Sequence, residues 1–256
     1  MAVASSLGDI HPQYNGPVTS SPTGRHFAQP AGAAGTPDQI LTDRRLYLCT
    51  PDRTDLESFV AASIRGGVDV VQLRDKHLDD RRLVDRGQLV GSICRDLGVP
   101  FIMNDRPDLA LEAGADGVHV GQDDATPASA RRILGEDAII GLSTHSVEQL
   151  ESSLGEPVTY ISAGPVVPTP TKPGRPGTGI DYASYATSVS SFPVFVTGGV
   201  TPRTVPGLVE SGVRRFVVVR WLTQAADPQR AARALCQAID DAIDRNAERP
   251  AGAAGC

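Results

Sequence analysis

Short apolar runs alternate with amphipathic segments along most of this chain, between residues 44 and 245. Runs that are apolar throughout are typical of parallel strands buried on both faces, and the amphipathic segments between them predict helices. The apolar runs predict eight strands, at Leu46–Cys49, Val68–Leu73, Pro100–Asn104, Gly117–Val120, Ala138–Leu142, Tyr160–Ala163, Val194–Thr197 and Phe216–Val219. The predicted helices include Asp55–Arg65, Asp80–Leu97, Pro127–Leu134, Val147–Leu154, Thr204–Ser211 and Pro228–Arg245.

Strands that alternate with helices indicate an α/β fold with a parallel sheet. An open, doubly wound sheet has the same local pattern, but the early GxGxxG motif common in such sheets is missing from this chain. Eight strand and helix units in about two hundred residues instead favour a closed (β/α)8 barrel, the TIM barrel. We therefore predict one barrel domain over residues 41–249.

The two ends of the chain differ from this pattern. Residues 1–40 are rich in Gly, Pro, Ala, Ser and Thr and show no hydrophobic period. Such a segment buries too little apolar surface to offset the entropy lost on ordering. We predict a disordered N-terminal tail over 1–40 and a flexible C-terminal tail over 250–256.

Charge and composition narrow the range of partners. The net charge is −6 and the sequence pI is about 5.3, and no stripe of Lys and Arg is present to neutralise a nucleic acid backbone. No apolar stretch is long enough to span a membrane, and the first forty residues do not resemble a signal peptide. The four cysteines are far apart and do not have zinc-ligand spacing, so we expect reduced thiols. These features predict a cytoplasmic protein that acts on small molecules, with no nucleic acid and no membrane partner.

Polar clusters follow several of the predicted strands. A barrel gathers the carboxyl ends of its strands around one mouth, so these clusters are expected to meet in a single site. Arg74, Lys76 and Lys172 suit a diphosphate, and Asp105 and Asp124 suit a hard divalent cation such as Mg²⁺.

These clusters carry a family resemblance. QLRDK at 72–76, Asn104-Asp105, HVGQDD at 119–124, GLSTH at 141–145, PTPTK at 168–172 followed by GRPGTG, and Gly198-Gly199 resemble the motifs of the thiamine-phosphate synthase family. The resemblance runs from about Arg44 to Arg245, and its specificity comes from six signatures in the family's order and spacing. It implies a transferase that joins an aminopyrimidine-methyl diphosphate to a thiazole phosphate, giving thiamine phosphate and pyrophosphate. Loss of pyrophosphate comes first in such a reaction, and one Mg²⁺ ion assists it.

The resemblance also implies a role for each motif residue. Asp105 and Asp124 would hold the Mg²⁺ ion, and Arg74, Lys76, Ser143 and Lys172 would promote departure of the diphosphate. The pyrimidine diphosphate would contact Gln72, Leu73, Arg74, Asp75, Lys76, Asn104, Ser143 and Lys172. The thiazole phosphate would contact Thr169, Pro170, Thr171, Gly199, Val219 and Arg220. Many relatives have small residues where this chain has Arg220-Trp221, so the shape of that corner is open.

Each of these residues also has a structural interpretation, and other functions compete. Arg74 and Asp75 alone would indicate a surface ion pair, and His119 and His145 are interpreted as hydrogen-bonded structural residues. Sugar and amino-acid isomerases share the fold and its phosphate site, but they need a positioned base. A thiazole tautomerase or a non-catalytic thiazole phosphate sensor would not need the residues assigned to the diphosphate and its cation, namely Arg74, Lys76, Asp105, Asp124 and Lys172. The presence of a carboxylate on the thiazole substrate and the number of subunits, a homo-oligomer included, stay open.

Overall fold

The computed structural model describes residues 36–169 and 176–248. Eight parallel strands form a closed barrel in chain order, with β8 hydrogen-bonded back to β1. The eight predicted strands are confirmed, with ends that shift by a few residues. The strands are β1 Leu46–Thr50, β2 Val70–Leu73, β3 Phe101–Asn104, β4 Gly117–Val120, β5 Ile139–Thr144, β6 Tyr160–Ala163, β7 Val194–Thr197 and β8 Arg215–Val218.

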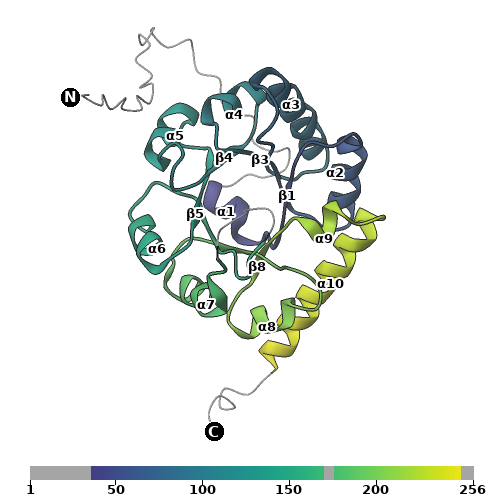
Figure 1. Cartoon of the computed structure of the whole chain (residues 1–256), viewed down its shortest axis with the longest axis vertical. Coiled ribbons are helices and arrows are strands. Elements are labelled where there is room, and N and C mark those ends of the chain that lie inside the picture. Colours follow the sequence, from purple (N-terminus) through teal and green to yellow (C-terminus); the bar gives the residue numbers. More distant parts are fainter. Residues whose placement is uncertain (1–35, 170–175, 249–256) are drawn as a thin grey trace, which may run out of the picture.

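Helices surround the ring of strands (Figure 1). They are α2 Leu56–Arg65, α3 Asp80–Asp96, α4 Pro107–Ala113, α5 Pro127–Leu134, α6 Val147–Ser153, α7 Gly179–Val189, α8 Val205–Glu210, α9 Arg220–Thr223 and α10 Pro228–Ala247. Apolar side chains fill the layer between strands and helices, for example Val71, Val118 and Phe216, each fully buried. Among the described helices, none is long and apolar enough to cross a membrane.

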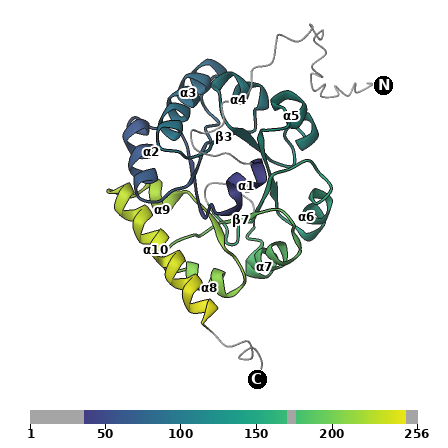
Figure 2. The same cartoon turned by 180° about the vertical axis from the view of Figure 1, so that it is seen from behind.

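A further helix, α1 (Pro37–Thr42), corrects the predicted tail boundary, because residues 37–40 belong to it. Residues 1–35 lie outside the described part of the chain. The sequence carried a signal for this helix start: Pro37 is the first helical residue, and the Gln39 side chain accepts a hydrogen bond from the Thr36 N–H at 3.0 Å. In both Figure 1 and Figure 2, α1 projects over the centre of the ring.

The barrel interior forms a second, smaller core. Leu41 of α1 belongs to it, so α1 packs its Leu41 side chain against the residues that point into the barrel. The other fully enclosed members point inward from alternate strand positions, and they are Tyr47, Val70, Ile102, Ile139, Tyr160 and Phe195. The three aromatic rings pack tilted or edge to face, with centroids 5.4 to 5.8 Å apart. These buried side chains therefore fill the part of the barrel interior that they occupy.

Candidate active site

A cavity of about 1350 Å³ opens at the carboxyl ends of the strands. Its lining brings together most of the predicted site residues from seven different strand ends. The predicted residues that line it are Gln72, Arg74, Asp75, Lys76, Asn104, Asp105, Asp124, Ser143, Thr169, Gly199, Val219 and Arg220. Lys172, Pro170 and Thr171 lie outside the described residues. Leu73 is fully buried in the core outside the lining, so any ligand contact from it would come from the main chain.

The loop after β2 carries the basic groups Arg74 and Lys76, and Asp75 between them holds that loop in shape. The Asp75 carboxylate accepts hydrogen bonds from the N–H groups of His77 at 2.8 Å, Leu78 at 3.0 Å and Asp52 at 3.2 Å. Burial alone would raise the Asp75 pKa, but these three N–H groups outweigh it and the pKa is lowered. Because its lone pairs are so engaged, Asp75 is better suited to positioning Arg74 and Lys76 than to contacting a ligand.

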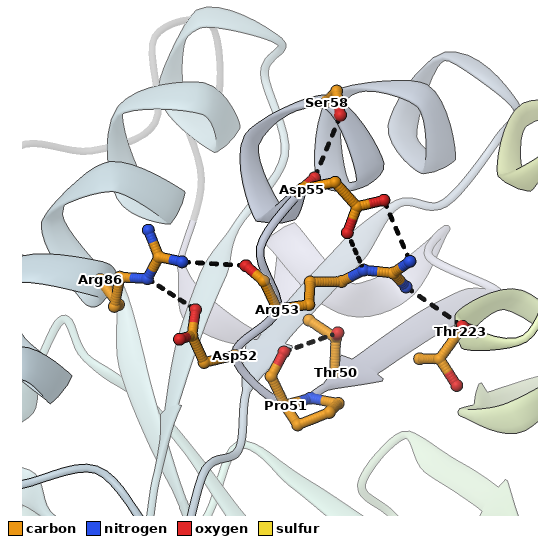
Figure 3. A network of polar contacts seen from close by, with 8 residues as sticks. All are labelled: Thr50, Pro51, Asp52, Arg53, Asp55, Ser58, Arg86 and Thr223. Carbon is orange, nitrogen blue, oxygen red and sulfur yellow. Dashed lines mark hydrogen bonds and ion pairs between the residues drawn. The ribbon is translucent and has the colours of Figure 1, made fainter.

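The loop after β1 lies between this basic loop and α9, because β1 pairs with both β2 and β8. Figure 3 shows Arg86 of α3 reaching both the Asp52 carboxylate and the Arg53 carbonyl. Arg53 in turn donates to the Thr223 carbonyl of α9 at 3.2 Å, and its guanidinium lies 3.9 Å from the centre of the Phe59 ring. The two predicted phosphate regions are thus joined by a continuous set of polar contacts.

Two carboxylates face each other across the ends of β3 and β4. The Asp105 pKa is raised, first by burial and then by the hydrogen-bonded Asp124 carboxyl, while the Lys76 ammonium at 3.4 Å opposes the rise. Asp105 has a positive φ of 63°, an uncommon backbone conformation for a residue other than glycine, which often marks a functional position. The Asp124 carboxylate also accepts the Gly121 N–H at 2.8 Å.

This carboxylate pair fits Mg²⁺ better than a transition metal. Within residues 36–169 and 176–248, no cluster of three or more His, Cys, Asp or Glu side chains suits a metal ion. Mg²⁺ usually keeps several waters and is held by one or two carboxylates together with substrate phosphates. Asp105 and Asp124 could supply the two carboxylates, and Arg74 and Lys76, which line the same cavity, could bind the phosphates.

Small residues shape the opposite side of the cavity. Gly198 and Gly199 have φ values of 98° and 76°, which favour glycine. A Cβ atom on Gly199 would lie 2.6 Å from the Val167 side chain. Arg220 begins α9 and is exposed, and its side chain makes no hydrogen bond or ion pair with the described residues. The Trp221 indole N–H donates to the Ala231 carbonyl of α10 at 3.1 Å.

The floor of the cavity includes Tyr47, which the sequence did not mark as a site residue. Gln72 donates to the Tyr47 hydroxyl at 2.9 Å, and His119 hydrogen-bonds to Ser143 at 2.8 Å. The interpretation of His119 and His145 as hydrogen-bonded residues is confirmed, since His145 contacts the Gly164 carbonyl. Tyr47 belongs to an apolar run, so no local signal marked it as part of the site.

The fold and the cavity define a class: a (β/α)8 barrel with a large cavity at the carboxyl ends of its strands, whose lining includes the basic side chains of Arg74 and Lys76 and the carboxylates of Asp105 and Asp124. Comparisons with known proteins agree. The family described as thiamine monophosphate synthase matches residues 46–222. A thiamine-phosphate synthase from Acidothermus cellulolyticus is 44% identical over 197 residues, which cover 75% of this chain and 93% of the relative.

Two further relatives support the same assignment. A thiamine-phosphate synthase from Thermus thermophilus is 46% identical over 197 residues, covering 75% of this chain and 95% of that protein. The structure of thiamine phosphate pyrophosphorylase from Pyrococcus furiosus superposes with a TM-score of 0.73 at 25% identity, covering 80% of this chain and 98% of that one. This chain belongs to the thiamine monophosphate synthase family.

Proposed function

We propose that this chain is a transferase that condenses 4-amino-2-methyl-5-(diphosphooxymethyl)pyrimidine with a thiazole phosphate to give thiamine phosphate and pyrophosphate. Family membership supports the reaction. The observation that carries the assignment of residues is the Lys76 ammonium 3.4 Å from the Asp105 carboxylate, with Arg74 and Asp124 lining the same cavity. A diphosphate with its cation needs both signs of charge side by side.

The reaction breaks one bond and forms another without a proton transfer. The bond between the pyrimidine methylene and the diphosphate oxygen breaks, and its electron pair leaves with pyrophosphate. The thiazole ring nitrogen, which carries no proton, then donates its lone pair to the methylene carbon. The site therefore requires no general base, and its main task is to stabilise charge that develops on the leaving group.

Individual residues are assigned to that task by their chemistry. The Arg74 guanidinium can bind two phosphate oxygens at once, while Lys76 and Lys172 act as single positive charges. Asn104 and Ser143 are buried beside the cavity and supply neutral donors. A Mg²⁺ ion held by Asp105 and Asp124 would neutralise further negative charge on the diphosphate. Gln72 would hold the aminopyrimidine, with one amide edge matching its amino group and ring nitrogen.

The thiazole phosphate is assigned to the other side of the cavity. Thr169, with Pro170 and Thr171, would border the ring, and the phosphate would meet the main chain at Gly199, Val219 and Arg220. The late strands of such barrels commonly bind phosphate in this way. We propose further that the protein works in the cytoplasm on small-molecule substrates, with no nucleic acid or membrane partner.

A pyrophosphate-release assay tests the proposal. With both substrates and Mg²⁺ present, pyrophosphate and thiamine phosphate should form in equal amounts, and omission of either substrate or addition of a chelator should stop the reaction. Arg74→Ala should reduce the rate, with Arg81→Ala on the exposed face of α3 as the matched control. Binding of thiazole phosphate without any pyrophosphate release would instead show a sensor.

A further inference from the structure

Six side chains hydrogen-bond in a row across the inside of the barrel. In order they are Cys49, Gln72, Tyr47, Tyr160, His119 and Ser143, joined at 3.1, 2.9, 2.9, 2.9 and 2.8 Å. All six are buried, and all but Tyr160 also line the cavity, including Gln72 and Ser143 near the two ends. The row thus connects the residue assigned to the pyrimidine with a residue assigned to the diphosphate, from β2 to β5.

Glycine makes room for the middle of the row. A Cβ atom on Gly141 would lie 2.1 Å from the Tyr160 ring, so the ring occupies the space that a side chain at position 141 would fill. Tyr160 is fully buried and does not line the cavity, although its hydroxyl contacts both Tyr47 and His119. Gly141, the glycine of GLSTH, therefore leaves the space that the Tyr160 ring occupies.

The row has a direction because its members have few protons. Burial raises the pKa of both Tyr47 and Tyr160, so each hydroxyl keeps its single proton and can donate only one hydrogen bond. A neutral imidazole likewise donates from one ring nitrogen and accepts at the other. Each inner member must then accept from one neighbour and donate to the next, and the donor at one end determines every bond after it.

Two directions are self-consistent, and they differ in what Ser143 presents to the cavity. If the Gln72 Nε2 group donates to Tyr47, then Tyr47 donates to Tyr160, Tyr160 to His119 Nδ1, and His119 Nε2–H to the Ser143 oxygen. The Ser143 proton is then left for a ligand. In the reverse direction the Gln72 amide is turned over so that its oxygen accepts from Tyr47, and Ser143 donates to His119 and has no proton left. Phosphate oxygens at neutral pH mainly accept, so only the first direction suits a diphosphate.

We propose that Tyr47, Tyr160 and His119 are positioning residues that form a relay of fixed direction, holding His119 neutral with its proton on Nε2 so that the Ser143 hydroxyl donates into the cavity. The significance of Ser143 as a donor rests on the proposed function. The direction of the relay is a property of the folded protein alone, and it can be measured without any substrate.

Nitrogen NMR of protein labelled with ¹⁵N in histidine measures that direction. Two-bond proton–nitrogen correlations distinguish the two neutral tautomers and the imidazolium, and loss of one signal set in His119→Gln assigns His119. We expect a protonated Nε2 and an unprotonated Nδ1 at neutral pH. Tyr160→Phe should shift the His119 Nδ1 signal, while Tyr185→Phe on α7, whose hydroxyl contacts Glu151 instead, should not. A proton on Nδ1 in the unaltered protein overturns the proposal.

A double-mutant cycle tests whether the relay acts through Ser143. Tyr160→Phe keeps the ring packed against Phe195 but breaks the row. It should lower kcat/KM for the pyrimidine diphosphate by about tenfold, the effect of a weakened hydrogen bond to a charged group, and leave the KM for thiazole phosphate unchanged. In a Ser143→Ala background the same change should have no further effect. Equal losses in both backgrounds would show that Tyr160 acts elsewhere. If the chain lacked the proposed activity, the NMR result would still decide the direction of the relay.

Discussion

Asp123 and Asp124 are adjacent in sequence but have different surroundings. Asp124 contacts both the Gly121 N–H and the Asp105 carboxyl, whereas no such contact to Asp105 is found for Asp123. Asp124→Ala removes one of two carboxylates assigned to Mg²⁺, so the rate should fall at least about a hundredfold and the Mg²⁺ concentration needed for half-maximal rate should rise. Steady-state rates over a Mg²⁺ titration measure both. Asp123→Ala is the matched control and should stay within about threefold; the opposite order of effects would reverse the ligand assignment.

Arg220 tests whether main chain or side chain binds the thiazole phosphate. Its side chain is exposed, and an exposed charge near a bound anion contributes only a few tenths to about one kcal/mol. Arg220→Ala should therefore change the KM for thiazole phosphate by less than about threefold. The KM for the pyrimidine diphosphate serves as the internal control. An increase of more than about tenfold in the first constant alone would show that the guanidinium binds the phosphate directly.

Residues that directly follow apolar runs were predictable as site residues, since every parallel strand of a barrel ends at the same mouth. Arg74 and Asp105 were recognised in this way, and Asp124, three residues further along its loop, was recognised through the family resemblance; all three line the cavity. The relay was not predictable, because Tyr47 and Tyr160 are 113 residues apart and meet only through the inward-facing register of β1 and β6. Their sequence pattern is that of ordinary buried residues.

At the scale of the elements, two aspartates join the starts of neighbouring strands. Asp69 before β2 accepts the N–H groups of Arg45 and Leu46 at 2.7 and 2.9 Å, and Asp116 before β4 accepts that of Phe101 at 2.7 Å. Burial raises the pKa of each carboxyl to about 6, despite these N–H groups. An unfolded aspartate titrates near 4, at about the reference value.

These two groups predict how stability depends on pH. Between about pH 4 and 6 the folded chain retains protons that the unfolded chain has lost, so the free energy of unfolding should fall as pH rises through this window. Urea unfolding at pH 5 and pH 7.5 measures the change. The paired variant Asp69→Asn and Asp116→Asn should reduce that pH dependence, while Asp85→Asn, at an exposed position on α3, should preserve it. An unchanged dependence in the paired variant would exclude these carboxyls as its source.

Helices and strands were predictable from the sequence wherever the hydrophobic period was clear. All eight strands and the long amphipathic helices α3 and α10 were predicted from it. Helices α4, α7 and α9 were not among the helices named from the sequence, and α9 has only four residues, too few for a helical period to appear. The tail assignment failed at α1 for a related reason: its six residues follow a long polar segment, and only the Thr36 to Gln39 start signal marks them.

At the scale of the whole molecule, α1 makes residues before the first strand part of the barrel. Leu41 is 1% exposed and packs among the inward-facing side chains that include Tyr47 and Tyr160. The Thr42 carbonyl of α1 also accepts a hydrogen bond from Arg215 of β8 at 2.7 Å. The helix therefore supports the same aromatic residues that form the middle of the relay.

Deletion of residues 1–35 and shortening of the buried Leu41 side chain should therefore differ in their effect on stability. Deletion of residues 1–35 leaves α1 and its start signal in place, so turnover should stay within about threefold and the unfolding temperature should not move. Leu41→Ala removes a buried side chain from the interior and should lower the free energy of unfolding by about 2 to 5 kcal/mol. Ile133→Ala, at an exposed apolar position on α5, is the control and should have little effect. Thermal unfolding with turnover measured in parallel separates the two outcomes.

A folded deletion variant with low turnover would place part of residues 1–35 in the working site, whereas an unchanged unfolding temperature in Leu41→Ala would show that α1 rests on the barrel without closing it.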